Sequence, residues 1–228
     1  MERYFDEELG RLKDDMRHMG DLVAEAVYRS VEALKGQDKP MAKKVIDDDK
    51  SIDEAELAID EECLDLLALR QPVAGDLRFI SMAMKIATDL ERMADLAVDI
   101  AQRVVELGDQ PLVKPLVDIP RLTMLAQTMT REAIGSFIAS DMDLATKVIL
   151  MDNEADRLRD RIQKDLIEDY MLKDPATIRG AVPLLLVARH LERICDHATN
   201  IAEDTIYRVK AKVVKHHPEK LNNNNGNK

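Results

Sequence analysis

Several residue types are scarce in the sequence, and each scarcity narrows the range of folds that the chain can adopt. Aromatic residues make up 3% of the 228 residues, and tryptophan is absent. Aromatic and β-branched residues favour strands, whereas the abundant Ala, Leu, Glu, Lys and Arg favour helices. Hydrophobic residues still amount to 46%, which is enough for a buried core. We therefore expect an all-α protein.

Disulfide motifs and long apolar segments are also lacking. Cys63 and Cys195 form no C-x-x-C pair, so we expect them to be reduced and buried in a cytoplasmic protein. The longest apolar run, AVPLLLVA, is too short to span a bilayer, so we expect no direct membrane insertion. The opening residues, MERYFDEELG, are charged, and we expect no signal peptide.

Basic residues are fewer than acidic residues. The chain has 44 Asp and Glu against 33 Lys and Arg, which gives a formal charge of −11. A net acidic surface repels nucleic-acid phosphates, so we expect no nucleic-acid partner. The same charge disfavours broad binding to anionic lipid.

Catalytic motifs are missing as well. The sequence has no Gly-rich phosphate loop, no Ser/His/Asp set and no Cys/His pair. No Glu is followed by His three residues later, the pattern of carboxylate-bridged di-iron bundles. His190 and His197 share one helix stripe and are interpreted as packed or surface histidines. We expect a non-enzymatic protein without catalytic residues.

The sequence does contain an internal repeat. KVIDDDKSID (44–53) matches KVILMDNEAD (147–156) with an offset of 103. DLERMADLAVDIA (89–101) matches HLERICDHATNIA (190–202) with an offset of 101. ELGDQPLVKPLVDIP, with three prolines, separates the copies as a linker. We predict a first repeat at 1–107, a linker at 108–120, a second repeat at 121–214 and a disordered polar tail at 215–228.

Heptad-like spacing predicts three long helices in each copy. The core-facing stripe of the first helix is Phe5, Leu9, Leu12, Met16, Met19, Val23 and Ala26. That of the second is Val45, Asp49, Ile52, Glu56, Ile59, Cys63 and Leu66. That of the third is Leu77, Ile80, Met84, Ala87, Glu91, Ala94, Val98, Ala101 and Val105. The expected fold is two tandem antiparallel three-helix bundles, related by internal duplication around a pseudo-twofold axis.

Acidic residues recur at matched places on these helices. Glu91, Asp95 and Asp99 are four residues apart, and each like-charge pair at this spacing costs a helix roughly 0.2–0.5 kcal/mol. Partly buried acids need partners, because an unpaired buried charge is costly. The first candidate metal site is Asp49, Asp53, Glu91, Asp95 and Asp99. The second is Asp152, Asp156, Glu192, Asp196 and Asn200.

Two kinds of partner fit these acids. Divalent or trivalent ions (iron, zinc, manganese or magnesium) bind carboxylate oxygens from facing helices. The alternative is ion pairing with arginines such as Arg92, Arg193 and Arg103. A carboxylate–metal enzyme and a metal-free helical scaffold therefore stay open. A direct phosphate receptor is disfavoured unless bound metal supplies positive charge.

At LERMAD and LERICDHATNIAED the sequence resembles the PhoU family of phosphate transport regulators. The resemblance covers roughly residues 4–214 and includes both E-x-x-x-D motifs, the GDLR stretch and the linker text LVKPLVDIP. Ala94 and Cys195 stand where the family often has Gly. Asp99 replaces a common Asn, and His190 corresponds to Asp89. We therefore expect unequal sites, the first preferring a higher-charge or second cation.

The resemblance implies a non-enzymatic, cytoplasmic regulator that is commonly dimeric and peripheral to the inner face of the membrane. Such proteins couple an ABC phosphate transporter, through its ATPase subunit, to a sensor histidine kinase. They repress the phosphate-starvation response and restrain uptake when phosphate is plentiful. Many bind metal clusters at the repeated acidic motifs. We expect any metal here to be structural or partner-bridging.

Overall fold

The computed structural model describes residues 2–210, and within that range it contains helices and no strands. The helices are α1 (Glu2–Gly36), α2 (Lys39–Asp48), α3 (Lys50–Arg70), α4 (Ala74–Leu107), α5 (Asp118–Ala139), α6 (Met142–Asp165) and α7 (Ile178–Lys210). A π-helical turn η1 (Leu166–Met171) and a 3-10 helix η2 (Pro175–Thr177) lie between α6 and α7. The tail predicted at 215–228 lies outside the described residues.

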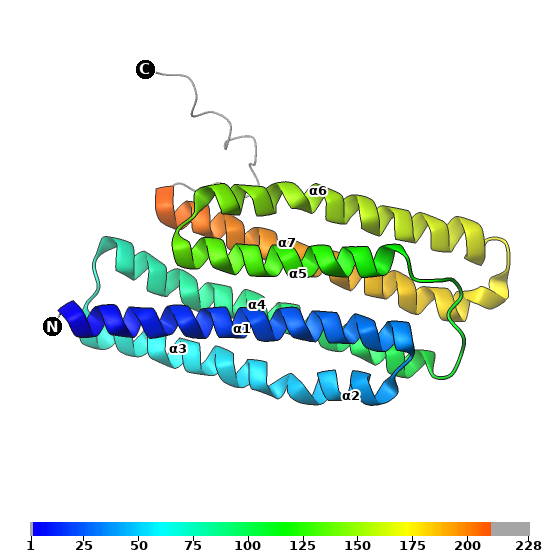
Figure 1. Ribbon diagram of the computed structural model, residues 1–228, viewed down its shortest axis with the longest axis horizontal. Coiled ribbons are helices and arrows are strands. Elements are labelled where there is room, and N and C mark those ends of the chain that lie inside the picture. Colours follow the sequence, from blue (N-terminus) through cyan, green and yellow to red (C-terminus); the bar gives the residue numbers. More distant parts are fainter. Residues whose placement is uncertain (1, 211–228) are drawn as a thin grey trace, which may run out of the picture.

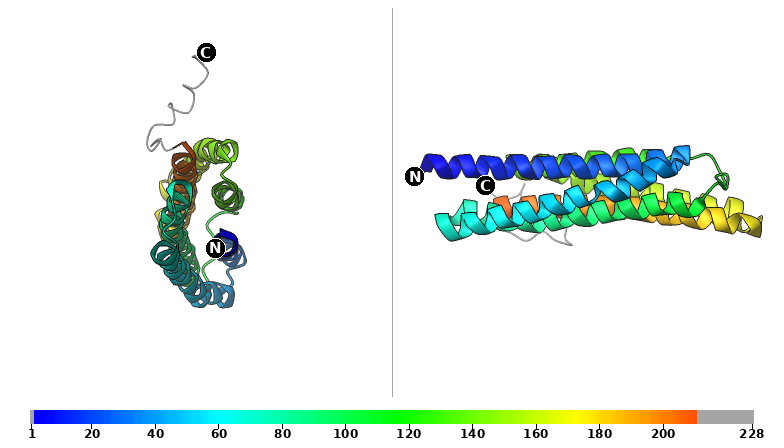
Figure 2. Two further views of the ribbon diagram at one scale, coloured as in Figure 1. Left: turned by 90° about the vertical axis from the view of Figure 1, so that its left-hand side faces the viewer. Right: turned by 90° about the horizontal axis from the view of Figure 1, so that it is seen from below.

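The helices form two antiparallel bundles side by side (Figure 1). The first bundle holds α1, α2, α3 and α4, and the second holds α5, α6 and α7. They meet where α1 packs on α5 and α4 packs on α7, and the end view in Figure 2 shows these pairs in two layers. Equivalent helices run in opposite directions, as a twofold axis perpendicular to them requires. The all-α, internally duplicated fold is confirmed.

The duplication extends to the start of the second helix in each copy. Asp38 caps α2 by accepting a 2.9 Å hydrogen bond from the Met41 backbone N–H. Asp141, which is 103 residues later, caps α6 by accepting 3.0 Å bonds from the N–H groups of Asp143 and Leu144. Each side chain thereby satisfies donors that the first turn of a helix leaves unpaired.

The second helix of the first copy is not continuous, so the prediction of one long helix there is wrong. It breaks at Asp49 into α2 and α3, whereas α6 runs unbroken through the equivalent Asp152. The Ser51 hydroxyl donates to the Asp48 carbonyl at 2.6 Å, and the Ile52 N–H bonds to the Asp49 carbonyl at 2.8 Å instead. A serine hydroxyl that competes for a helical carbonyl is a known cause of such distortion.

Burial follows the predicted stripe on α1 more closely than on α4. Leu12, Met16 and Met19 are fully buried. Leu77 and Val105, at the ends of the stripe predicted for α4, are 43% and 48% exposed, so those two assignments are wrong. Because α4 packs against α1, α2, α3 and α7, its buried face is wider than a two-helix seam and buries Phe79 and Val104 near its ends in place of Leu77 and Val105.

Both cysteines are free and buried, as expected. Burial raises the pKa of the Cys63 thiol to about 12, and it also raises the pKa of Cys195. Thiols are nucleophilic as thiolates, so neither cysteine is reactive in the folded chain.

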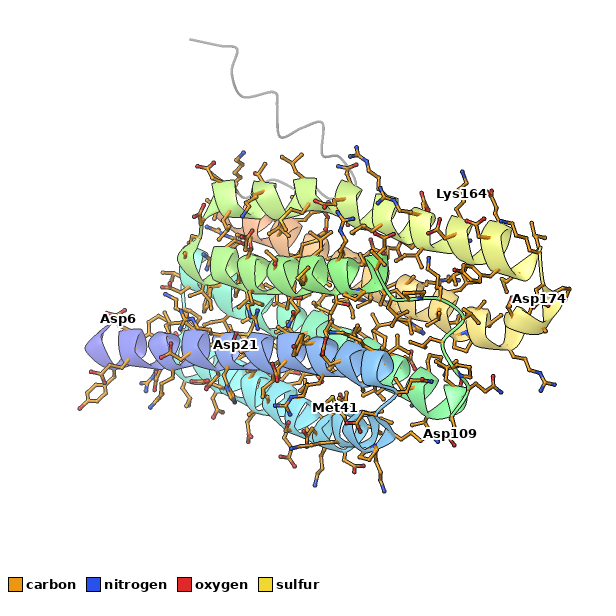
Figure 3. The ribbon with its side chains drawn as sticks, turned by 45° about the vertical axis from the view of Figure 1, so that its right-hand side comes forward. Asp6, Asp21, Met41, Asp109, Lys164 and Asp174 are labelled. Atoms are coloured by element: carbon orange, nitrogen blue, oxygen red, sulfur yellow. The ribbon has the colours of Figure 1, made fainter. Side chains whose placement is uncertain are left out.

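Residues 108–117 connect the bundles and pack on both. Lys39 Nζ on α2 lies 2.6 Å from Asp109 Oδ1, and Lys114 Nζ lies 3.0 Å from Asp165 Oδ2 on α6. Asp109 and Asp174 mark the ends of the two bundles at the same side of the molecule (Figure 3). A Cβ on Gly180 of α7 would come within 2.7 Å of Val113 Cγ1, so the linker sits tightly against α7.

We predict opposite effects for Gly75→Ala and Gly180→Ala, which lie near the starts of α4 and α7. Gly75 has open space around a new Cβ, so alanine should stabilise the chain by about 0.5–1 kcal/mol. Gly180→Ala crowds the stiff Val113 side chain and should cost about 1–3 kcal/mol. Urea unfolding measures both. Equal effects, or no rescue of Gly180→Ala by Val113→Ala, would contradict this packing.

Candidate metal centres

The first acidic cluster forms where the α2–α3 break faces α4. Burial, together with the negative charges of Asp53 and Asp95, raises the pKa of Asp49 to about 6. Asp49 and Asp53 come from one side of the cluster and Asp95 comes from α4. The structure thus brings these three sequence-predicted residues together.

Glu91 lies in the same cluster and is poorly compensated. Burial raises its pKa, and the charges of Asp95, Glu56 and Asp53 add to this, while Arg92 opposes it. The Oε2 atom of Glu91 is buried without a hydrogen-bond partner and lies 3.4 Å from Arg92 Nε. Arg92 is 59% exposed and also holds Asp95 at 3.1 Å, so a single surface arginine serves two acids.

Asp99 lies at the contact between α4 and α7. Its Oδ2 atom is 3.9 Å from His190 Nδ1. Burial lowers the pKa of His190, against the pull of Asp99, and the same Nδ1 atom has no hydrogen-bond partner. His197 Nδ1 lies 2.9 Å from Asp89 Oδ1 at the same helix contact. Both histidines are mostly buried, in agreement with the packed interpretation.

The second cluster lies between α6 and α7. Burial raises the pKa of Asp196 to about 6, helped by the charges of Glu192, Asp152 and Asp156. Burial and Asp156 raise the pKa of Asp152, while Thr199 Oγ1 donates to it at 3.4 Å. These four acids come together as predicted.

Asn200 is half-buried one turn beyond Asp196 on α7. No hydrogen bond of its side chain is recorded within residues 2–210. Its role as a ligand, like that of Asp99, stays a prediction.

Arg159 is a member of the second cluster that the sequence did not lead us to expect. Its Nη2 atom lies 2.8 Å from Asp156 Oδ1 and 3.5 Å from Glu192 Oε1, so the guanidinium spans α6 and α7. Glu56, which is 103 residues earlier, occupies the matching place beside Glu91 and was considered only as a core-facing position. The opposite charges at positions 56 and 159 are visible in the sequence and could have indicated that the two clusters differ.

The second cluster is accessible from outside. A groove of about 580 Å³ between α6 and α7 is lined by Arg159, Arg189, Glu192, Arg193 and Asp196 among others. An ion or a partner side chain can therefore reach these carboxylates and guanidinium groups without opening the core.

The chemistry of both clusters fits a cation with oxygen ligands. Crowded carboxylates with raised pKa values and the orphaned Oε2 of Glu91 indicate too little positive charge around them. Within residues 2–210, no three Asp, Glu, His or Cys side chains converge into a ready-made cage. Side-chain rotation is thus needed for several carboxylates to meet on one ion.

No helix in the described part of the chain combines the length and apolarity needed to cross a bilayer.

Comparison with known protein families shows to which family this chain belongs. The PhoU domain matches this sequence twice, at residues 16–104 and 119–205. The chain belongs to the PhoU family. It is 42% identical over 209 residues to a phosphate-specific transport system accessory protein PhoU homolog of Aquifex aeolicus, covering 92% of this chain and 94% of the relative. The Pseudomonas aeruginosa homolog of that name is 37% identical over 230 residues, covering 97% and 94%.

Solved PhoU structures share the fold over almost the whole chain. The crystal structure of PhoU from Pseudomonas aeruginosa matches with a TM-score of 0.86 at 37% identity, covering 91% of this chain and all of that one. The phosphate transport system regulatory protein PhoU from Streptococcus pneumoniae matches with a TM-score of 0.85 at 30% identity, covering 92% and 99%. The resemblance drawn from the E-x-x-x-D motifs is confirmed.

The raised pKa values predict that Asp196→Asn stabilises the metal-free PhoU protein at about pH 8. An acid whose folded-state pKa exceeds its ordinary value of 3.8 gives stability that is full below about pH 4 and lost as pH rises to about 6. Removing the charge should therefore add about 1 kcal/mol above pH 6, after allowance for solvent screening, and almost nothing below pH 4.

Urea unfolding of chelator-treated protein across this pH range makes the measurement. Asp65→Asn, on the exposed face of α3, is the control and should change the free energy of unfolding by less than about 0.5 kcal/mol. A pH-independent effect of Asp196→Asn would show that burial of its charge is not the cause.

Proposed function

We propose that this PhoU-family protein is a non-enzymatic regulator of phosphate homeostasis. The observation that carries the proposal is the match of nearly the whole chain, including both acidic motifs, to proteins named as accessory or regulatory components of phosphate transport. It couples an ABC phosphate transporter, through the ATPase subunit, to a sensor histidine kinase. When phosphate is plentiful, it represses the phosphate-starvation response and restrains uptake.

Exposed helix faces support a docking role. On α3, Leu57 is 66% exposed and Leu64, two turns later, is 56% exposed. Apolar residues at this spacing form one stripe, which suits contact with a partner helix. An adaptor of this kind changes the state of a partner only by contacting two of its states differently.

We propose further that the clusters bind divalent or trivalent metal ions. Asp49, Asp53, Glu91 and Asp95 hold the first site, with Asp99 beside it. Asp152, Asp156, Glu192 and Asp196 hold the second, with Asn200 beside it. A bound cation neutralises the crowded carboxylates and fixes the helices that carry them, so its role is structural or partner-bridging.

The charge and the helix properties support a cytoplasmic protein held at the inner face of the membrane through its partners. A homodimer is part of the proposal, as the family resemblance implies.

The double variant Asp95→Ala/Asp196→Ala should lose bound metal and weaken repression. Elemental analysis of protein purified without chelator or a nickel column measures the metal. A phosphate-starvation reporter in a bacterium lacking its own PhoU measures repression at high phosphate. Asp65→Ala, on an exposed helix face, is the matched control and should keep both.

Two other outcomes favour the alternatives. A metal-free wild type that still represses would assign the acids to arginine partners and leave a helical scaffold. Metal-dependent turnover of a phosphorylated or oxidisable substrate would favour a carboxylate–metal enzyme.

A further inference from the structure

The two acidic clusters differ in one charged position that lies at their centre. Position 56 in the first copy and position 159 in the second are related by the same offset as Asp53 and Asp156. The first carries glutamate and the second carries arginine. Arg159 Nη2 lies 3.5 Å from the motif glutamate Glu192, and Glu56 lies near enough to the motif glutamate Glu91 for the two charges to repel each other.

The guanidinium of Arg159 stands between the carboxylates that face each other across the second cluster. It contacts Asp156 on α6 at 2.8 Å and Glu192 on α7 at 3.5 Å, and its Nε lies 3.2 Å from Asp160 Oδ1. Glu192 is 17% exposed, and the charge of Arg159 opposes the rise in pKa that burial of this carboxylate causes. A planar guanidinium that bridges two acids does the electrostatic work of a bridging cation.

In the first cluster the guanidinium of Arg92 pairs with Glu91 and Asp95, which both lie on α4, and within residues 2–210 no ion pair links Glu91 to a cation on another helix. Glu56 adds a negative charge where Arg159 supplies a positive one, and Glu91 Oε2 is buried without a hydrogen bond. The only cation in ion-pair contact with Glu91, within residues 2–210, is its surface neighbour Arg92. Asp99 was expected to make the first site more negative, but its carboxylate faces His190 on α7. The inequality therefore comes chiefly from positions 56 and 159.

We propose that Arg159 is the resident cation of the second cluster, so that the first cluster binds metal more tightly and fills first. The inference rests on the metal binding proposed above. A metal ion entering the second cluster must displace a guanidinium that links α6 and α7 through Asp156 and Glu192, whereas an ion entering the first cluster displaces only the surface residue Arg92. One PhoU chain thus carries a high-affinity site and a low-affinity site.

Titration with Mn²⁺ tests the proposal, because the electron paramagnetic resonance signal of the free ion reports binding directly. Glu91→Gln/Asp95→Asn removes the first site and should abolish the tight class of binding. Glu192→Gln/Asp196→Asn removes the second site and should abolish the weak class. The reverse assignment would overturn the proposal.

Arg159 is then substituted in the Glu91→Gln/Asp95→Asn protein, which lacks the first site. Arg159→Gln should tighten Mn²⁺ binding at the second site by at least about tenfold. Arg159→Lys keeps the charge and should leave binding weak. Arg157→Gln removes an exposed charge two residues away on α6 and should change the affinity by less than about twofold.

The reciprocal change keeps the test decisive if Arg159→Gln fails to fold. Glu56→Arg, in the protein that lacks the second site, should weaken Mn²⁺ binding at the first site by at least about tenfold. Unchanged affinity in both exchanges would overturn the role of Arg159 while leaving metal binding intact. Absence of Mn²⁺ binding in the wild type and all variants would overturn the metal proposal itself, and this inference with it.

Discussion

The packing of α4 against α7 is the contact on which the rest of the molecule depends, because it joins the two bundles and carries both motif glutamates. Small residues on both helices, such as Ala97 on α4 and Ala198 on α7, are fully buried. Lys85 on α4 pairs with Asp204 on α7, whose side chain is 8% exposed. A charge buried to this extent is tolerated only while it is paired, so the ion pair also fixes the register of the helices.

Aromatic stacking reinforces the same junction. The rings of Phe79 on α4 and Phe137 on α5 are stacked with centroids 4.9 Å apart, and the Arg208 guanidinium of α7 lies 5.0 Å from each. Three helices from both bundles therefore meet in one cation–π cluster. With α4 and α7 held in this way, their outer edges face α3 and α6, and the acidic clusters form at those edges.

Features that occur in both copies could be predicted from the sequence, whereas features that occur in only one copy could not. The α1 stripe through Leu12 and Met16 and the acids at matched offsets follow from periodicity, which local spacing reveals. The break at Asp49 depends on a single hydroxyl of Ser51, and the exposure of Leu77 depends on how far the neighbouring helices extend. Neither feature can be predicted from the spacing of apolar residues in α2 or α4 alone. Arg159 was visible in the sequence, but only the contact with Glu192 across two helices gives it meaning.

Duplication explains how two similar clusters can carry different electrostatics at little cost to the fold. The core positions of each copy are fixed by packing, whereas positions 56 and 159 are only partly buried and carry opposite charges. In the second copy Arg159 pairs with Asp156 and Glu192, although burial still raises the pKa values of Glu192 and Asp196. In the first copy Asp49 and Glu91 keep raised pKa values, which means that their ionised forms oppose folding. Any ligand that binds these ionised acids in the folded state alone stabilises the first bundle through linkage. The same linkage applies to the second bundle through Asp152 and Asp196, whose pKa values are also raised.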